Sequence, residues 1–284
     1  MKEFVYLNGK FVEAGDASVS VFDRGLNYGD GLFETMKARE GKPLLLKEHA
    51  RRLKAGARAL RFALPPLKAF LDDIDKGALE TLLRKNRLME GEAYLKLIVT
   101  RGADKGGHLP SKGPKPTTII VAKKLDEEYL WGLRKAGVAA VFVEGLCPAL
   151  PGVKSLNYLP SVMAKMEAAK NAAFEALFTT GGFVTEGSSS NVFAVNGGHL
   201  TTPPLASGSL PGIMRGEVIR LAKKWGFPAI EAPLSTKALE QAEEAFLTNS
   251  RMEAVPLVRI GKKKIAGGRP GSLTKAVQLL LRPL

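Results

Sequence analysis

The most informative segment of the chain begins with Lys154-Ser155-Leu156-Asn157-Tyr158. It continues through a predicted helix and strand to Thr185-Glu186-Gly187-Ser188-Ser189-Ser190-Asn191 and ends at Leu210-Pro211-Gly212-Ile213-Met214. A lysine, an acid among small hydroxylated residues and a helix N-terminus thus follow one another. Because a lysine amine can bind a ligand covalently and a helix N-terminus binds phosphate, this order indicates a covalently held, phosphorylated cofactor.

The flanking sequence suits each of these roles. Lys154 follows a Pro/Gly loop and precedes an apolar helix, a context that can present an amine to a ligand. Glu186 ends a predicted strand, where a carboxylate could keep a pyridine nitrogen protonated. Pro211-Gly212-Ile213-Met214 starts a helix whose free N–H groups can bind phosphate. Taken singly, these residues also fit a surface lysine, a hairpin acid and an ordinary helix start.

The composition is that of a folded protein without disulfides. The 284 residues are 45% hydrophobic, enough to form one large domain or two modest ones. Cys147 is the single cysteine, so no internal disulfide can form and a reducing compartment is expected. No apolar run approaches the roughly 20 residues of a membrane span, and Met1-Lys2-Glu3-Phe4 shows no signal-peptide pattern. We expect a cytoplasmic protein without a membrane partner.

The formal net charge of +14 points first to nucleic-acid binding. However, lysine and arginine are spread along the whole chain, the run Lys262-Lys263-Lys264 is short, and aromatic residues make up only 7%. A solvated basic surface explains this pattern, and we expect no nucleic-acid partner. The histidines at positions 49, 108 and 199 lack metal-ligand spacing, so no metal site is expected.

Hydrophobic periodicity predicts an α+β fold of two domains. In the N-terminal part we expect a hairpin, strands and two helices broken by Pro65-Pro66: the hairpin at 4–14, strands at 19–22, 32–38, 93–100 and 117–121, and helices at 46–62 and 67–85. The charged segment 123–133 interrupts the strand pattern. The expected domains are therefore a small N-terminal domain at 1–122, an interdomain linker at 123–133 and a large cofactor-binding domain at 134–284.

In the C-terminal part, strand-and-turn sequence typical of an antiparallel sheet dominates. We expect strands at 138–143, 175–179, 183–185, 191–195, 199–202 and 246–248, and helices at 158–171 and 212–225. Pro211 is expected at the first helical position. The first of these helices carries an apolar stripe that is expected to face the core: Leu159, Val162, Met163 and Met166.

These motifs resemble those of the fold-type IV, pyridoxal-phosphate (PLP)-dependent class IV aminotransferases. That family includes branched-chain aminotransferases, D-amino-acid aminotransferases and aminodeoxychorismate lyases. The resemblance covers essentially the whole chain, and its further motifs are Tyr6-Leu7-Asn8-Gly9, Phe22-Asp23-Arg24-Gly25, Tyr28-Gly29-Asp30-Gly31-Leu32-Phe33-Glu34 and His49-Ala50-Arg51-Arg52-Leu53. It implies a homodimer, PLP as the cofactor, a small α/β N-terminal domain and a larger C-terminal domain with an antiparallel or barrel-like sheet.

The resemblance also implies roles for single residues. Lys154 would hold PLP covalently and move the substrate Cα proton, and Glu186 would pair with the pyridine nitrogen. Leu210 would pack on the ring face, and Tyr158 would bind the phenolic oxygen of the cofactor.

The implied phosphate site combines side chains and a helix start. Arg52 would bind the phosphate, together with the backbone N–H groups of Ile213 and Met214 and with Ser250 nearby. Met214 stands where the family usually has threonine, so a hydroxyl contact is lost here while a backbone contact is retained.

The substrate-binding residues follow no single branch of the family. Gly106 stands where D-amino-acid enzymes have a carboxylate-binding arginine, whereas His108 aligns with their histidine. Thr35 resembles the lyases and short-chain members, and Tyr28 is a further candidate. For the substrate carboxylate the candidates are Arg251 and Lys37.

The sequence therefore predicts a PLP-dependent aminotransferase that moves an amino group between an amino acid and a 2-oxo acid by a ping-pong mechanism, of branched-chain or D-amino-acid type. The alternative is a 4-amino-4-deoxychorismate lyase that releases pyruvate in folate biosynthesis. A distant alternative, supported by charge alone, is a nucleic-acid-binding protein on an inactive scaffold.

Overall fold

A computed structural model describes residues 2–62, 64–111, 113 and 115–282. It divides the chain into two units. The N-terminal unit comprises the residues up to Asp126 together with Val153–Asn157, and the C-terminal unit comprises Glu127–Gly152 and the chain from Tyr158 onward. The segment that carries Lys154 therefore returns to the N-terminal unit.

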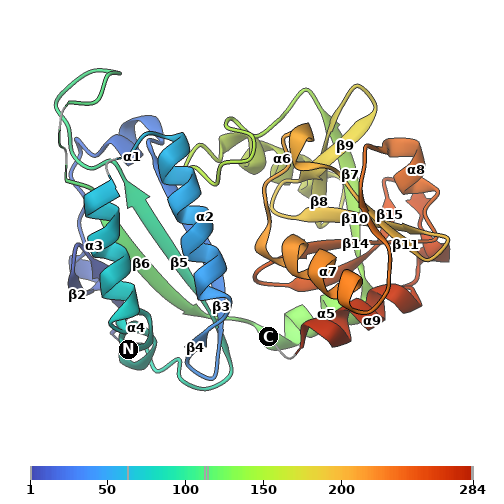
Figure 1. Ribbon diagram of the computed structural model, residues 1–284, viewed down its shortest axis with the longest axis horizontal. Coiled ribbons are helices and arrows are strands. Elements are labelled where there is room, and N and C mark those ends of the chain that lie inside the picture. Colours follow the sequence, from blue (N-terminus) through green and yellow to red (C-terminus); the bar gives the residue numbers. More distant parts are fainter. Residues whose placement is uncertain (1, 63, 112, 114, 283–284) are drawn as a thin grey trace. The chain divides into compact units, whose positions relative to one another are not determined.

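The N-terminal unit is built on an antiparallel sheet of six described strands, in the order β2-β1-β6-β5-β3-β4. The strands are β1 (Phe4–Leu7), β2 (Lys10–Glu13), β3 (Gly31–Arg39), β4 (Lys42–Pro43), β5 (Glu92–Thr100) and β6 (Thr118–Lys124). The helices are η1 (Ala14–Asp16), α1 (Arg24–Tyr28), α2 (Leu46–Ala59), α3 (Leu64–Asp75) and α4 (Ala78–Lys85). Helices α2, α3 and α4 lie against one face of this sheet (Figure 1), where Leu53, Phe70 and Leu82 share a core with Met36 and Leu95.

Several predicted elements of this unit are confirmed, and two are corrected. The hairpin forms with Asn8 at φ 49° and Gly9 at φ 87°, the left-handed backbone that a two-residue hairpin loop favours. The strand predicted at 19–22 is wrong, because these residues form a loop that ends in a turn, and Val21 is 70% exposed. The helix predicted at 67–85 is two helices, since Gly77 at φ 92° separates α3 from α4. Pro65-Pro66 lies in the first turn of α3.

The C-terminal unit has a ten-stranded sheet in the order β12-β11-β10-β14-β15-β7-β8-β9-β13, with β16 paired to β15. Its strands are β7 (Val138–Glu144), β8 (Glu175–Thr180), β9 (Phe183–Gly187), β10 (Asn191–Asn196), β11 (His199–Thr202), β12 (Ala229–Glu231), β13 (Leu234–Ser235), β14 (Glu244–Asn249), β15 (Glu253–Ile260) and β16 (Lys263–Lys264). Its helices are α5 (Glu127–Ala136), α6 (Leu159–Lys170), η2 (Leu205–Ser207), α7 (Ile213–Lys224), α8 (Thr236–Glu240), η3 (Ala266–Gly268) and α9 (Ser272–Leu281).

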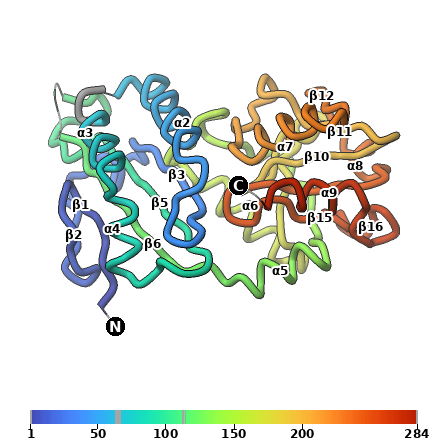
Figure 2. The backbone as a smooth tube through the Cα atoms, turned by 60° about the horizontal axis from the view of Figure 1, so that its bottom comes forward, coloured from blue at the N-terminus to red at the C-terminus, as the bar shows by residue number. Residues whose placement is uncertain are grey.

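This sheet is mixed. The hairpins β8–β9 and β10–β11 are antiparallel as expected, but β7 pairs in parallel with both β8 and β15, and β11 pairs in parallel with β12. A parallel neighbour needs a crossover connection, which α6 provides between β7 and β8. Helix α9 runs close to β15 (Figure 2), and the side-chain amide of Gln278 donates to the carbonyl of Ala254 at 3.1 Å.

Helix α6 corrects the prediction about its apolar stripe. Small residues, Ser161, Ala164 and Ala168, are buried, and the two alanines pack in a cluster with Phe178 of β8. Small side chains let the helix lie close to the sheet, so the large residues point outward. Exposed fractions of 49–67% are found for the four stripe residues: Leu159, Val162, Met163 and Met166.

The segment 123–133, predicted to be a linker, consists largely of regular structure. Strand β6 ends at Lys124, and α5 begins at Glu127. Acidic residues in the first turn of α5 and basic residues in its last turn complement the helix dipole, which favours a helix here.

The prediction that Pro211 is the first helical residue is wrong. Pro211 precedes Gly212, which is the N-cap of α7. No helix in the described residues is long and apolar enough to cross a lipid bilayer.

Candidate active site

Lys154 is held by backbone pairing with the start of β3. The Phe33 N–H donates to the Lys154 carbonyl at 3.0 Å, and the Leu156 N–H donates to the Gly31 carbonyl at 2.9 Å. The Nζ of Lys154 lies 4.3 Å from the centroid of the Phe33 ring. The backbone of the lysine motif therefore pairs directly with the backbone at the end of the Gly-Asp-Gly motif.

Two glycines permit this contact. Gly29 adopts φ 65°, and its carbonyl accepts a hydrogen bond from the Asn157 side-chain amide at 3.0 Å. A Cβ on Gly29 would lie 2.7 Å from the Asn157 Oδ1, and a Cβ on Gly31 would overlap the side chain of Leu156. The motif needs glycine at both positions because the lysine segment approaches the backbone itself.

Arg52 is fixed by a carboxylate that sequence reasoning did not assign. Glu34, 1% exposed, accepts from Arg52 Nε at 2.8 Å on one oxygen and from an Arg52 terminal nitrogen at 2.6 Å on the other. His49 Nδ1 lies 2.7 Å from the second oxygen. The bidentate pair fixes both the position and the orientation of the guanidinium.

The ionisation of this cluster follows from its burial. Burial alone would raise the pKa of Glu34, but the hydrogen bonds and charge of Arg52, with His49, lower it to about 2. Burial lowers the pKa of His49, and the charges of Arg52 and Lys154 add to that effect against the opposing influence of Glu34. Near neutral pH, His49 is therefore uncharged and Glu34 is ionised, so we assign the Nδ1 proton as a donor to the carboxylate.

The substrate candidates of the N-terminal unit have different surroundings. Thr35 is half-buried on β3. Lys37 is 2% exposed, and its Nζ lies 2.6 Å from a carboxylate oxygen of Glu92. The charge of Lys37 is thus balanced within the unit. Tyr28 and His108 meet edge to face, with ring centroids 5.7 Å apart.

In the C-terminal unit, the Glu186 carboxylate is tied to the chain just before α7. Glu186 is 8% exposed, and one of its oxygens accepts from the Leu210 N–H at 2.8 Å. Asn191, from the same loop motif, donates through its side-chain amide to the Leu210 carbonyl at 3.0 Å. The acid loop and the Leu210 turn are therefore joined on both faces of one peptide segment.

The start of α7 has no side-chain cap among the described residues. Its N-cap, Gly212, supplies no side-chain acceptor to the first N–H groups. A Cβ on Gly212 would overlap the Asn191 side chain, so the turn requires glycine. Ile213 and Met214 are the first two helical residues, and Met214 is 4% exposed. The Met214 side chain packs inside the unit. Met214 thus lacks the hydroxyl of the usual threonine but keeps its backbone N–H at the start of the helix.

A third element meets the acid loop through Asn249. Its side-chain amide donates to the Ser189 carbonyl at 3.1 Å, while its Oδ1 accepts from the N–H groups of Arg251 and Met252 at 3.0 and 2.9 Å. Ser250 and Arg251 are thereby held in a turn beside the loop. Within the described chain, the buried hydroxyl of Thr248, just before this turn, has no hydrogen-bond partner.

The serines of the acid loop serve a buried carboxylate. Glu175, fully buried on β8, accepts hydrogen bonds from the hydroxyls of Ser188, Ser189 and Ser190, the last two at 2.9 Å. The Nζ of Lys165 lies 3.2 Å from the same carboxylate. The loop that carries Glu186 is therefore tied to the sheet by its own hydroxyls.

Each unit thus collects part of the predicted site. In the N-terminal unit, Lys154 and Arg52 both act electrostatically on His49. The C-terminal unit assembles the other predicted cofactor residues, except for Tyr158, which is the half-buried N-cap of α6: Glu186, Leu210, Ile213, Met214 and Ser250. Five residues that orient these groups through hydrogen bonds had no predicted role, although several of them stand inside the motifs. They are Glu34, His49, Glu175, Asn191 and Asn249.

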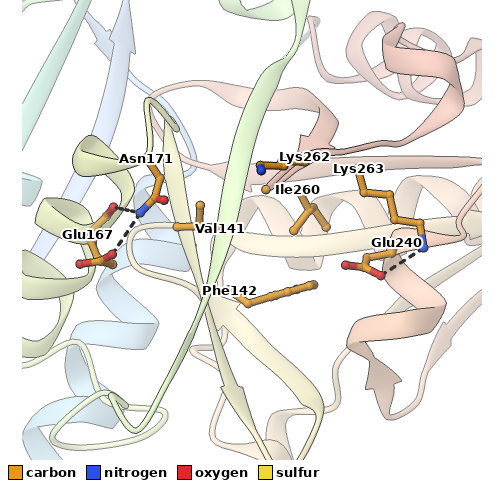
Figure 3. Close-up of a pocket in the computed structure, with 9 residues that line it drawn as sticks. Val141, Phe142, Glu167, Asn171, Glu240, Ile260, Lys262 and Lys263 are labelled. Atoms are coloured by element: carbon orange, nitrogen blue, oxygen red, sulfur yellow. Dashed lines mark hydrogen bonds and ion pairs between the residues drawn. The ribbon is translucent and has the colours of Figure 1, made fainter.

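A cavity of about 470 Å³ lies elsewhere in the C-terminal unit, between β7, α6 and the β15–β16 turn. Figure 3 shows that its polar groups largely pair with one another. Asn171 donates to Glu167, and Lys263 lies 3.2 Å from Glu240. None of the predicted site residues lines this cavity. Among the described residues, no cluster of His, Cys, Asp or Glu is arranged to hold a metal ion.

We expect Glu34→Gln to lower the free energy of unfolding at pH 7 by about 3 kcal/mol, because it leaves Arg52 beside a neutral group. The depressed pKa of Glu34 contributes stability above the unfolded value of 4.5, which is lost as the pH falls toward about 2. The depressed pKa of His49 acts in the same direction below its ordinary value of 6.5. Urea unfolding at several pH values should show wild type and variant converging between pH 4.5 and 2. Exposed Glu3→Gln is the control, with a change within about 0.5 kcal/mol; a constant gap between wild type and Glu34→Gln down to pH 2 would contradict the assignment.

Gly212 and Gly216, one turn apart at the start of α7, give a second test. Gly212→Ala should destabilise the protein by about 1–3 kcal/mol, because its Cβ meets the buried Asn191. Gly216 is exposed with no atom near its Cβ position, so Gly216→Ala should stabilise the helix by up to about 1 kcal/mol. Thermal and urea unfolding measure both effects, and equal effects of the two substitutions would be inconsistent with the described turn.

Comparison with known proteins identifies the family. Residues 31–260 match the family described as amino-transferase class IV. A putative branched-chain-amino-acid aminotransferase of Methanocaldococcus jannaschii is 42% identical, covering 96% of this chain and 93% of the relative. A D-alanine aminotransferase of Staphylococcus epidermidis is 32% identical over 96% and 95%, and an aminodeoxychorismate lyase of Bacillus subtilis is 34% identical over 98% and 93%.

Solved structures lead to the same family and bear out the predicted α+β, fold-type IV class. The branched-chain amino acid aminotransferase of Escherichia coli has a TM-score of 0.85 at 27% identity, covering 100% of this chain and 95% of that chain. The branched-chain aminotransferase of the archaeon Thermoproteus uzoniensis, solved with norvaline, has a TM-score of 0.84 at 27% identity, covering 99% and 94%. With a family match over most of its length and relatives this similar, the chain belongs to the class IV aminotransferases.

Proposed function

We propose that the protein is a PLP-dependent aminotransferase that moves an amino group between an amino acid and a 2-oxo acid by a ping-pong mechanism. The observation that carries the proposal is the link between Glu186 and the Leu210 N–H, which lies directly before the uncapped start of α7. A carboxylate and a helix N-terminus held one turn apart suit a pyridine ring at one end and a phosphate at the other.

The residues present fit PLP. The first N–H groups of α7 lack a side-chain cap, and the buried hydroxyl of Thr248 has no partner among the described residues, as expected beside a polar ligand. Ser250, in the adjacent turn, adds a hydroxyl. The N-terminal unit supplies Lys154 and an Arg52 guanidinium already oriented by Glu34. We infer that these groups hold the cofactor, with Tyr158 toward its phenolic oxygen and Leu210 against its ring.

The cofactor, when bound, supplies a ring that withdraws electrons from the substrate Cα. Glu186 would keep the ring nitrogen protonated, and the α7 N–H groups, Ser250 and Arg52 would hold the phosphate. Lys154 would anchor the cofactor and would carry the proton from the substrate Cα. Neutral His49 beside Arg52 adds no positive charge near the lysine.

The substrate carboxylate needs a cation to pair with. The ion pair of Lys37 with Glu92 leads us to assign Lys37 no substrate role. Exposed Arg251, in the turn beside the acid loop, is the cation that we propose for the carboxylate, and His108 with Tyr28 forms a second substrate-facing group. Thr35 on β3 is the remaining candidate.

A second candidate function is the elimination of pyruvate from 4-amino-4-deoxychorismate. The Bacillus subtilis lyase, 34% identical over nearly the whole chain, favours it. The lyase and the transaminase would use the same Lys154 and Glu186, so the acceptor requirement distinguishes them. We assign the protein to the cytoplasm, since its single cysteine fits a reducing compartment.

The decisive experiment follows the cofactor absorbance of purified, PLP-loaded protein. An amino donor should bleach the long-wavelength band, and 2-oxoglutarate should restore it; pyruvate released without any acceptor would instead establish the lyase. Lys154→Ala should lower turnover about a thousandfold or more. Lys96→Ala is the matched control, because its Nζ also lies over the Phe33 ring, at 5.2 Å, and it should retain wild-type turnover. Protein that binds no PLP would refute the proposal.

We further propose that the protein is a homodimer whose interface includes the outward stripe of α6. A contiguous row of large apolar side chains on one helix face is characteristic of a surface covered by a partner. The stripe consists of Leu159, Val162, Met163 and Met166.

Met166→Glu should convert the dimer to monomer, because it would bury a carboxylate in an apolar interface. Leu279→Glu is the matched control: Leu279 lies on α9 and is 59% exposed, against 60% for Met166. Light scattering after gel filtration measures both masses. A wild-type monomer, or a Met166→Glu variant that stays dimeric, would refute this interface.

A further inference from the structure

We propose that Arg24 is a positioning residue that holds His108 against Tyr28, so that the two rings form one preassembled substrate-facing group. The inference rests on the proposed function, in which Tyr28 and His108 face the substrate. It assigns Arg24 a part in substrate selection that its burial alone would not indicate.

Arg24 is 3% exposed and connects three segments of the N-terminal unit. Its Nε donates to Asp30 of the Gly-Asp-Gly motif at 2.9 Å. Its two terminal nitrogens donate to consecutive carbonyls of the glycine-rich loop, Gly107 at 2.7 Å and His108 at 2.8 Å. The guanidinium therefore binds the backbone of His108, the residue whose ring contacts Tyr28.

The same guanidinium also contacts the other ring. Arg24 and Tyr28 begin and end α1, four residues apart, and so share one helix face. The Cζ of Arg24 lies 4.8 Å from the centroid of the Tyr28 ring. His108 completes the arrangement by meeting Tyr28 edge to face at an interplanar angle of 62°. One cation thus contacts the Tyr28 ring and also binds the backbone carbonyl of His108.

The carboxylate that binds Arg24 also binds a second arginine. Asp30 receives both Arg24 and Arg101, whose Nε donates to it at 2.7 Å. Burial alone would raise the pKa of Asp30, but the two arginines lower it below its ordinary value, so the carboxylate stays ionised. Asp104 also holds the loop, since it accepts from the N–H groups of Gly106 and Ser111 at 2.8 and 2.7 Å and lies 4.0 Å from a terminal nitrogen of Arg24.

Arginine is suited to this position in a way that lysine is not. Three separate acceptors, a carboxylate and two carbonyls, are met by one planar group with donors in fixed directions. A lysine could keep the charge near Asp30 but could not hold both carbonyls in this geometry. Since Tyr28 and His108 are both exposed in the described chain, their relative position depends on this support more than on surrounding packing.

Arg101 provides a matched control for a purely structural role. It shares Asp30 with Arg24 but extends to the carbonyl of Leu60 at 2.8 Å, away from Gly107 and His108. Both Arg24→Lys and Arg101→Lys therefore disturb the same carboxylate, and only the first releases the loop that carries His108.

The test compares these two variants by steady-state kinetics on the PLP-loaded enzyme. Arg24→Lys should raise KM for the amino donor about tenfold, equivalent to about 1.4 kcal/mol, with kcat within about twofold of wild type. Arg101→Lys should leave KM within about twofold. In a double-mutant cycle, His108→Ala should raise KM in wild type but not in Arg24→Lys, because the two residues act as one unit. Hydrogen exchange of the segment 102–111 should accelerate in Arg24→Lys alone.

An unchanged KM in an active Arg24→Lys enzyme would overturn the inference, as would equal increases in both lysine variants or additive effects of Arg24→Lys and His108→Ala. If the wild type proves to be a lyase, the same comparison is made with 4-amino-4-deoxychorismate, so failure of the transaminase proposal leaves this test intact. A wild type inactive on both substrate classes would overturn the proposed function and this inference with it.

Discussion

The pairing of the Lys154 segment with the first residues of β3 is the contact on which the site depends. Two backbone hydrogen bonds and the Asn157 amide hold this segment on the Gly-Asp-Gly turn. Because the segment is anchored by backbone, its position does not depend on the side chain of Lys154. The short return of the chain to the N-terminal unit brings Lys154 close enough to act electrostatically on His49, as Arg52 does.

Around this contact the protein uses buried carboxylates to orient other groups. Glu34 orients an arginine, Asp30 joins two arginines, Glu175 collects hydroxyls and Glu186 binds a backbone N–H. Glu34, Asp30 and Glu175 are each met by several donors, which offsets the cost of their burial. Groups held in this way lose little freedom when a ligand arrives, and binding energy is then available for the reaction.

Motifs that act through short-range geometry could be found from the sequence. The family, the hairpin at Asn8-Gly9 and the strands β3 and β5 could be predicted because their sequence patterns depend little on tertiary packing. The sequence could not show which face of an amphipathic helix packs against the sheet. The period of α6 is clear, but only packing against β8 decides that alanines face inward and methionines outward.

Charged residues show the same limit. Lys37 looks like a free cation in the sequence, yet it pairs with Glu92, which β5 brings alongside β3. Glu34 and His49 stood in recognised motifs without an assigned task, because their partnership with Arg52 is formed by packing α2 on β3. A linker was expected where β6 and α5 nearly meet, since a charged helix start resembles a solvated connection.

The three hydroxyls bound to Glu175 have a consequence for what the acid loop can offer a ligand. Each serine hydroxyl has a single proton, and the protons of Ser188, Ser189 and Ser190 all point to the carboxylate. Toward any other neighbour these side chains can act only as acceptors. A run of serines beside the predicted cofactor site is therefore poor at binding anions through its hydroxyls.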